Sequence, residues 1–103
     1  MRAAIGTRVS LHAGPYEFHH VTYDAPSDVV YAALEAPKPS CRQERTEEGD
    51  ILRFDREGHF FGFVLTEPRE QLERDGVVYL SLPSGDRVRV QGIEALVGRR
   101  DPA

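Results

Sequence analysis

The chain has 103 residues, of which 40% are hydrophobic and 29% charged, with a formal net charge of -4. This length allows one domain, residues 1–103, with a single modest core, and excludes a second domain. The acidic balance argues against nucleic acid as a partner, because duplex binding depends on clustered cations. No apolar run is long enough for a membrane span or a signal peptide, and the lone Cys41 fits a reducing compartment, so we expect a cytoplasmic protein.

Alternating side chains predict two strands near the N-terminus. Apolar or β-branched residues alternate with polar residues or glycine over residues 5–11, a period typical of a half-buried strand. Ala13-Gly14-Pro15 breaks this pattern, and a second strand is expected from Tyr16 to Tyr23, which forms a hairpin with the first. The side chains expected on one face are Ile5, Thr7, Val9 and Leu11 of the first strand, and Tyr16, Phe18, His20 and Thr22 of the second.

The segment 28–35 fits either a strand or a helix. As a helix, it would begin at Ser27 and carry Val29, Val30, Ala33 and Leu34 on one face. We favour a strand, because β-branched and aromatic residues are poor helix formers and Pro37 leaves no room for a third turn.

The segment 37–50 is polar and contains a run of charged residues. We expect a solvated loop, with a short exposed strand or a helical turn as alternatives. The last residues, 98–103, are expected to form a tail that contains the Arg99-Arg100 pair.

Residues 51–65 hold the densest aromatic cluster of the chain. The segment Asp55-Arg56-Glu57-Gly58 predicts a type I turn whose last residue is left-handed, in a bulged hairpin. The expected cross-strand pairs are Asp55 with His59, Phe54 with Phe60, and Leu52 with Gly62. This register assigns Leu52, Phe54, Phe60 and Val64 to the interior, and leaves Ile51, Arg53, Phe61, Phe63 and Leu65 on the opposite face.

The C-terminal third predicts one short helix and a second hairpin. The helix is expected near 68–75, with Pro68 in its first turn and Gly76 as its stop. Strands are expected over 77–82 and 86–91, with Tyr79 opposite Arg89 as a surface cation–π pair. Gly92 to Val97 is either a last strand or a turn of helix. The buried face of this hairpin is expected to carry Val78, Leu80, Val88 and Val90.

These elements predict a mainly β fold, with α+β as the alternative. The strands are joined by turns rather than by crossover helices, so they predict a small antiparallel sheet, sandwich or barrel of hairpins with one short helix.

Two segments resemble a known family. The run Tyr23-Asp24-Ala25-Pro26-Ser27-Asp28-Val29-Val30-Tyr31 is followed by Asp55-Arg56-Glu57-Gly58-His59-Phe60-Phe61-Gly62. Over residues 23–65 this resembles the small bacterial domain of unknown function twenty-two eighty-three, whose members look like Tyr-Asp-x-x-x-Asp-x-Leu-Tyr, a strand, and an Asp-x-x-Gly turn. Phe63-Val64 stands where that family usually has Ile-Glu. The resemblance implies a small β-rich module of unknown activity, of the kind thought of as a partner in toxin–antitoxin-like pairs.

A weaker resemblance is to the helix-grip fold of START-like and polyketide-cyclase proteins. It rests on Ala25 to Leu34 and on Gly62-Phe63-Val64-Leu65. It implies a small-molecule ligand or an enzymatic activity, and a long C-terminal helix that closes a cavity. Few residues follow Gly92, so we rank this fold second.

The sequence contains no pattern that assigns a catalyst, and we expect neither an enzyme nor a cofactor. Phosphate loops, nucleophile elbows and dinucleotide fingerprints are absent. Asp24 and Asp28 flank a turn and are expected to bond its amides rather than to act as an acid/base pair. The candidates for a metal site, which we rank below ordinary strand histidines, are His19, His20 and His59.

The aromatic hairpin favours a binding function. An uncharged, β-prone run such as Phe60 to Leu65 must lie in the middle of a sheet or be sealed by another molecule. We therefore predict an interaction module that binds a protein partner and forms a homodimer, with a regulatory or antitoxin-like role. The predicted interface consists of Ile51, Phe61, Phe63 and Leu65.

Overall fold

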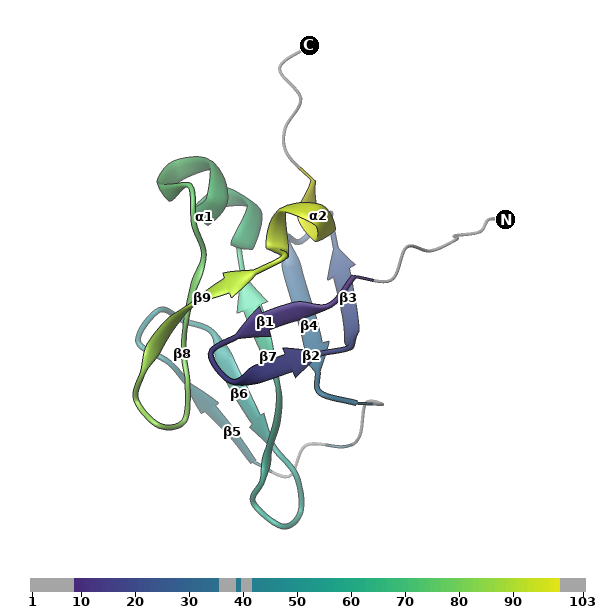
Figure 1. The fold of residues 1–103 in the computed structure, drawn as a ribbon, viewed down its shortest axis with the longest axis vertical. Helices are drawn as coiled ribbons and strands as arrows, with labels where there is room; N and C mark the ends of the chain where they lie inside the picture. Colours follow the sequence, from purple (N-terminus) through teal and green to yellow (C-terminus); the bar gives the residue numbers. More distant parts are fainter. Residues whose placement is uncertain (1–8, 36–38, 40–41, 99–103) are drawn as a thin grey trace, which may run out of the picture.

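The computed structural model describes residues 9–35, 39 and 42–98, and these residues form two antiparallel sheets and two short helices (Figure 1). The four-stranded sheet has the order β2-β1-β9-β8, with β1 Leu11–Ala13, β2 Tyr16–Phe18, β8 Tyr79–Ser81 and β9 Arg87–Gln91. The five-stranded sheet has the order β3-β4-β7-β6-β5, with β3 His20–Asp24, β4 Val29–Ala33, β5 Arg42–Arg45, β6 Ile51–Phe54 and β7 Phe60–Thr66. The prediction of a mainly β fold is confirmed.

The core fills the space between the two sheets. In Figure 1 the four-stranded sheet lies in front of the five-stranded sheet. Buried side chains from both sheets make up the core cluster. Phe18 and Phe63, both fully buried, meet edge to face with their ring centroids 4.7 Å apart. Such contacts between facing sheets are what a sandwich of hairpins needs to bury its apolar surface.

The predicted strand from Tyr16 to Tyr23 is two strands in different sheets. Phe18 points into the core, and so do the partly buried Val21 and Tyr23, so the alternation changes phase at His19. The chain crosses there from the four-stranded to the five-stranded sheet, and the strand is interrupted at His19 where it turns from one sheet to the other. Much of the predicted strand at 5–11 lies outside the described residues, and β1 begins at Leu11.

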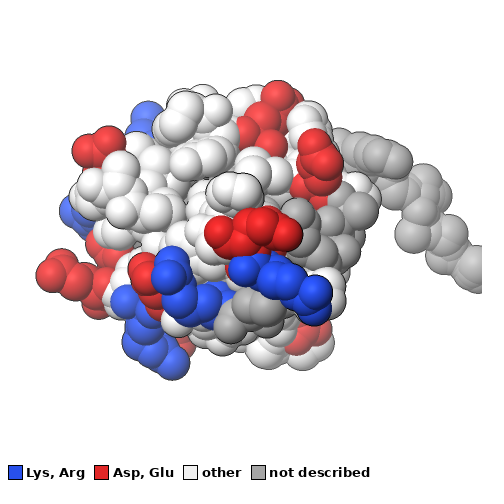
Figure 2. Space-filling view, turned by 90° about the horizontal axis from the view of Figure 1, so that it is seen from below, with Lys and Arg blue, Asp and Glu red and all other residues white. Residues whose placement is uncertain are grey.

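The ambiguous segment after Ser27 is a strand, as predicted. β4 pairs with β3 on one side and β7 on the other. Part of the predicted loop 37–50 is also a strand, because Arg42–Arg45 pairs with β6 as an edge of the sheet. All four residues of β5 are exposed, and charges on an exposed edge discourage pairing with other chains. Seen from below the view of Figure 1, basic and acidic side chains lie next to one another on the surface (Figure 2).

The register of the central hairpin differs from the prediction by one residue. The turn is as predicted, since the amide of Asp55 donates to the carbonyl of His59 and Phe54 pairs with Phe60. Beyond that pair, however, Leu52 lies opposite Phe63, because the ladder shifts between Arg53 and Phe54. An extra residue in one strand turns every following side chain to the other face.

This bulge makes the predicted assignment of the two faces wrong for the part of β7 that follows it, whereas Leu52 and Phe54 on β6 face the core as predicted. Phe63 and Leu65 are fully buried in the core beside Leu52, whereas Val64, expected inside, points outward. Phe60 stays on the core side, as predicted, because it precedes the shift.

The two helices lie close together at one end of the molecule (Figure 1). α1, Pro68–Asp75, has the predicted bounds and ends at Gly76, whose φ of 77° is the left-handed value that favours glycine. The segment 92–97, for which the sequence allowed either a strand or a turn of helix, forms the helix α2, Ile93–Val97. Among the described residues, helices span eight and five residues, which provides no long C-terminal helix of the helix-grip type.

The second hairpin has the predicted register. Tyr79 pairs with Arg89, although the guanidinium that lies over the Tyr79 ring, at 4.3 Å, belongs to Arg87. No described helix is long and apolar enough to cross a membrane.

Candidate functional site

The outer face of the five-stranded sheet carries a row of apolar side chains. Tyr31 on β4 pairs with Val64 on β7, and Val64 pairs with Ile51 on β6. Tyr31 is 45% exposed, the only exposed large hydrophobic residue among those described, and Val64 and Ile51 are half-buried. We call these three residues the outer row. Cross-strand neighbours of this kind form one continuous surface.

Polar and charged residues lie at the two edges of this face. Thr22 and Asp24 are on β3 at one edge, where Thr22 pairs with Tyr31. Arg45 is on β5 at the other edge and pairs with Ile51, and Arg53 on β6 points the same way. The face therefore carries a carboxylate, Asp24, at the β3 edge, and the guanidinium groups of Arg45 and Arg53 toward the β5 edge.

Two of the four predicted interface residues cannot take part in an interface. Phe63 and Leu65 are fully buried between the sheets. Ile51 does lie on the outer face. Phe61 is the bulged residue, is 4% exposed, and lies beside the guanidinium of Arg53, 5.2 Å from its ring centroid. Sequence reasoning missed Tyr31 and assigned Val64 to the interior, although alternation along 29–33 places Tyr31 opposite to the buried Val30.

The three histidines that were candidate metal ligands do not converge on one point. The carboxylate of Glu17 is 3.3 Å from His12 Nε2 and 3.8 Å from His19 Nε2, on the exposed surface. His20 is exposed on β3, on the side of the sheet opposite to its inward neighbour Val21. His59 lies in the β6–β7 turn, so the three candidate metal ligands belong to separate surroundings.

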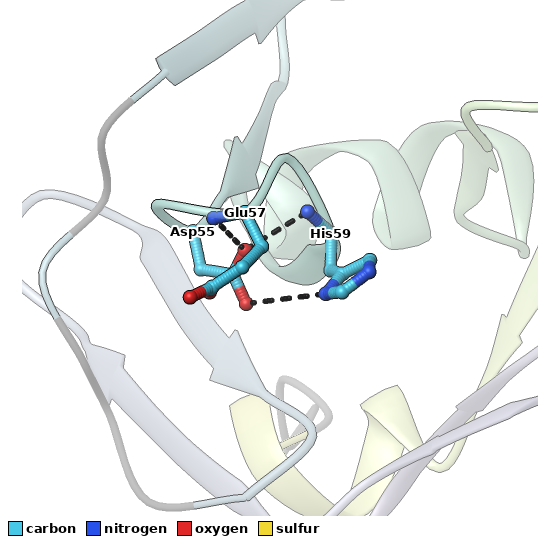
Figure 3. Close-up of side chains that lie close together, drawn as sticks. All are labelled: Asp55, Glu57 and His59. Carbon is cyan, nitrogen blue, oxygen red and sulfur yellow. Dashed lines mark hydrogen bonds and ion pairs between the residues drawn. The ribbon is translucent and has the colours of Figure 1, made fainter.

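One group in the part of the chain that is described could bring metal ligands together (Figure 3). The potential ligand atoms of Asp55, Glu57 and His59 lie within 4.8 Å of one another. Asp55 Oδ1 accepts hydrogen bonds from the amides of Glu57 at 3.0 Å and His59 at 2.9 Å, and Asp55 Oδ2 is 3.9 Å from His59 Nδ1. These bonds hold the turn, and the side chains of Glu57 and His59 are exposed. The arrangement is accounted for by the hairpin itself.

Asp28 fixes the start of α1 from a distant part of the chain. Its carboxylate accepts the amides of Arg69 at 3.1 Å and Glu70 at 3.2 Å, and the hydroxyl of Tyr23 at 2.9 Å. We expected Asp28 to bond its own turn, and the structure corrects this. The helix has no side-chain cap from its own N-cap residue, so Asp28 supplies the missing acceptor. Burial, and then the Asp28 carboxylate, raise the pKa of Tyr23.

Asp50 is a buried carboxylate at the end of the Thr46–Asp50 turn. Asp50 is fully buried, and its Oδ1 accepts the amide of Thr66 at 2.9 Å and the hydroxyl of Thr66 at 3.3 Å. Burial raises the pKa of Asp50 against these hydrogen bonds, and the charge of Glu48 raises it further. The sequence offered no signal for this, since Asp50 stood in a segment predicted to be solvated.

Glu48 ties the same turn to the other sheet. Its carboxylate oxygens lie 3.0 and 3.1 Å from the Ser81 hydroxyl, and Oε2 is 3.3 Å from Arg87 Nε. Burial opposes ionisation of Glu48, but hydrogen bonds from the Ser81 side chain, the Glu48 backbone and the Thr46 side chain, together with the charge of Arg87, outweigh it, and the pKa of Glu48 is lowered.

Fold and site together define a small two-sheet β protein with one partly apolar sheet face. Comparison with known proteins adds no relative: no family model, no curated protein and no solved structure matches the chain.

Proposed function

We propose that the protein is a non-catalytic interaction module that binds through the outer face of its five-stranded sheet, and that the occupant of this face is a second copy of the chain. The observation that carries the proposal is the outer row, in which Tyr31 is 45% exposed beside Val64 and Ile51. Residues that β-sheets normally bury are here half-exposed and adjacent, as at the centre of a protein–protein interface.

The charges at the edges support a symmetric pair. A two-fold axis parallel to the strands places the β3 edge of one copy over the β5 edge of the other. Asp24 then approaches the partner copy's basic edge, which carries Arg45 and Arg53, and the same contact occurs twice. Matching of opposite charges fixes orientation and suppresses wrong partners.

The size of the face sets the expected strength. Five strands at about 4.8 Å and five residues at about 3.3 Å give a face of roughly 24 by 17 Å, or about 400 Å² on each copy. A standard stable interface buries about 800 Å² on each partner, so we expect weak, concentration-dependent association. A face of this kind suits regulated binding, including the exchange of a second copy for a different protein partner, as in an antitoxin-like role. A cytoplasmic location remains part of this proposal.

Sedimentation velocity over a range from about 10 to 500 μM protein tests the proposal. We expect the weight-average mass of the wild type to rise toward that of a dimer, and the substitutions Tyr31→Ser and Ile51→Ser to abolish the rise. Tyr79→Ser on β8, in the other sheet, is the matched control and should associate like the wild type. A monomer at every concentration, or equal behaviour of Tyr31→Ser and Tyr79→Ser, would refute self-association through this face.

A further inference from the structure

The buried carboxylate of Asp50 is satisfied on one oxygen only. Thr66 donates its amide and hydroxyl to Oδ1, whereas Oδ2 is buried and has no hydrogen-bond partner among the described residues. Burying an ionised carboxylate that has one oxygen without a hydrogen-bond partner costs much more free energy than burying the protonated carboxyl. Because Oδ1 serves as the acceptor, the proton belongs on Oδ2.

The turn around Asp50 is closed by its own hydrogen bonds. The Thr46 amide donates to the Asp50 carbonyl at 2.8 Å, and the Asp50 amide donates to the Thr46 hydroxyl at 3.1 Å. The Thr66 hydroxyl also lies 3.4 Å from the Gly49 carbonyl oxygen. Thr66 on β7 therefore contacts both the backbone of Gly49 and the carboxylate of Asp50.

The charged groups that face the turn do not neutralise Asp50. Glu48 adds a negative charge near Asp50, and the guanidinium of Arg87 on β9 lies against Glu48 Oε2, with Nε at 3.3 Å. Arg45 on β5 directs its guanidinium to the Gly49 carbonyl at 3.5 Å. On β7 the contact is Thr66, which is uncharged. Ionisation of Asp50 therefore places a second negative charge beside Glu48 in a buried position.

We propose that the Thr46–Asp50 turn is a proton-operated latch: neutral Asp50 holds the turn on Thr66 of β7, and ionisation of Asp50 as pH rises releases it. Release exposes the carboxylate to water and frees the end of the β5–β6 hairpin, which bears Arg45 and Ile51. The latch depends only on the contacts of this turn and stands whether or not the outer face binds a second copy.

Linkage gives the sign of the effect. In the open turn Asp50 regains the ordinary pKa of 3.8, and in the closed turn its pKa is raised. The closed form therefore binds the proton more tightly, and the opening equilibrium constant rises by up to about tenfold per pH unit between 3.8 and the closed-state pKa. Above the closed-state pKa it levels off.

Amide hydrogen exchange followed by NMR measures this opening, with the Thr66 amide as the reporter because it donates to Asp50 Oδ1. We expect the exchange protection of Thr66 to fall with pH in the wild type and to be independent of pH in Asp50→Asn, which keeps an oxygen acceptor but cannot ionise. Glu94→Gln, an exposed acid on α2, is the control and should retain the pH dependence of the wild type.

A carbon-detected titration of the Asp50 carboxyl in the wild type keeps the test decisive if Asp50→Asn fails to fold. The latch is supported if the titration midpoint of Asp50 lies above 3.8 and the exchange protection of Thr66 falls over the pH range between 3.8 and that midpoint. A midpoint at or below 3.8, or the same pH-dependent exchange in Asp50→Asn and the wild type, overturns it.

Discussion

Gly62 tests the packing of the two central strands of the five-stranded sheet. It lies on β7 opposite Ala33 of β4, and a Cβ at this position would lie 2.4 Å from the carbonyl oxygen of Ala32 and 3.3 Å from the Cα of Ala33. Both atoms belong to the backbone of the neighbouring strand, so no side-chain rotation can relieve the contact. Gly62→Ala must push β4 and β7 apart.

The expected cost follows from the distances. Carbon and oxygen atoms need more than 3 Å, so a contact of 2.4 Å requires the strands to move by most of an ångström. Overpacking of this kind typically costs 1–3 kcal/mol, and we expect about 3 kcal/mol because the ladder hydrogen bonds are strained as well. At about 4–8 °C per kcal/mol for a domain of this size, the melting temperature should fall by roughly 12–24 °C.

Gly58→Ala in the β6–β7 turn is the matched control. Its Cβ would meet no atom within 4 Å, but Gly58 has a φ of 85°, so the substitution strains only the backbone. That strain costs about 1–2 kcal/mol. Urea denaturation of the two variants should therefore rank Gly62→Ala below Gly58→Ala. The reverse ranking, or a melting temperature of Gly62→Ala within about 2 °C of the wild type, would refute the close approach of β4 and β7.

Three further experiments test other parts of the structure. Asp28→Ala should lower the free energy of unfolding by about 1–2 kcal/mol and selectively speed amide exchange at Arg69 and Glu70, whereas Asp28→Asn, which keeps one acceptor oxygen, should lose less. Phe63→Ala should cost about 3–5 kcal/mol and Tyr31→Ala less than about 0.5 in chemical denaturation; similar costs would contradict the assignment of the two faces. Asp50→Asn should gain stability relative to the wild type as pH rises above 3.8, because folding raises the Asp50 pKa and the amide of asparagine cannot ionise. Parallel stability curves of the wild type and Asp50→Asn against pH would contradict the assignment.

Local signals in the sequence located much of the fold. Pro68 in the first turn and Gly76 at the stop gave α1 its bounds, because each residue has a backbone conformation that fits a helix end. The register of β8 and β9 was also predictable from the sequence, because the position of the turn and the alternation of the two faces both require the same pairing. The candidate site was only partly predictable: Ile51 lies on the outer face as expected, whereas Tyr31 was not recognised.

The sequence by itself determined most of the strands, the turns of the two hairpins and the ends of α1, because these follow from propensities and spacings within a few residues. The tertiary structure decided where a strand is interrupted and which face it buries after the interruption. The bulge at Phe61 turns Phe63 and Leu65 inward, and the crossing at His19 sends one predicted strand into two sheets. Asp28 becomes the cap of a helix 41 residues away, a contact between segments with no local sign of each other. A single extra residue or a change of sheet reverses the exposure of every following side chain, so burial depends on pairing between distant strands.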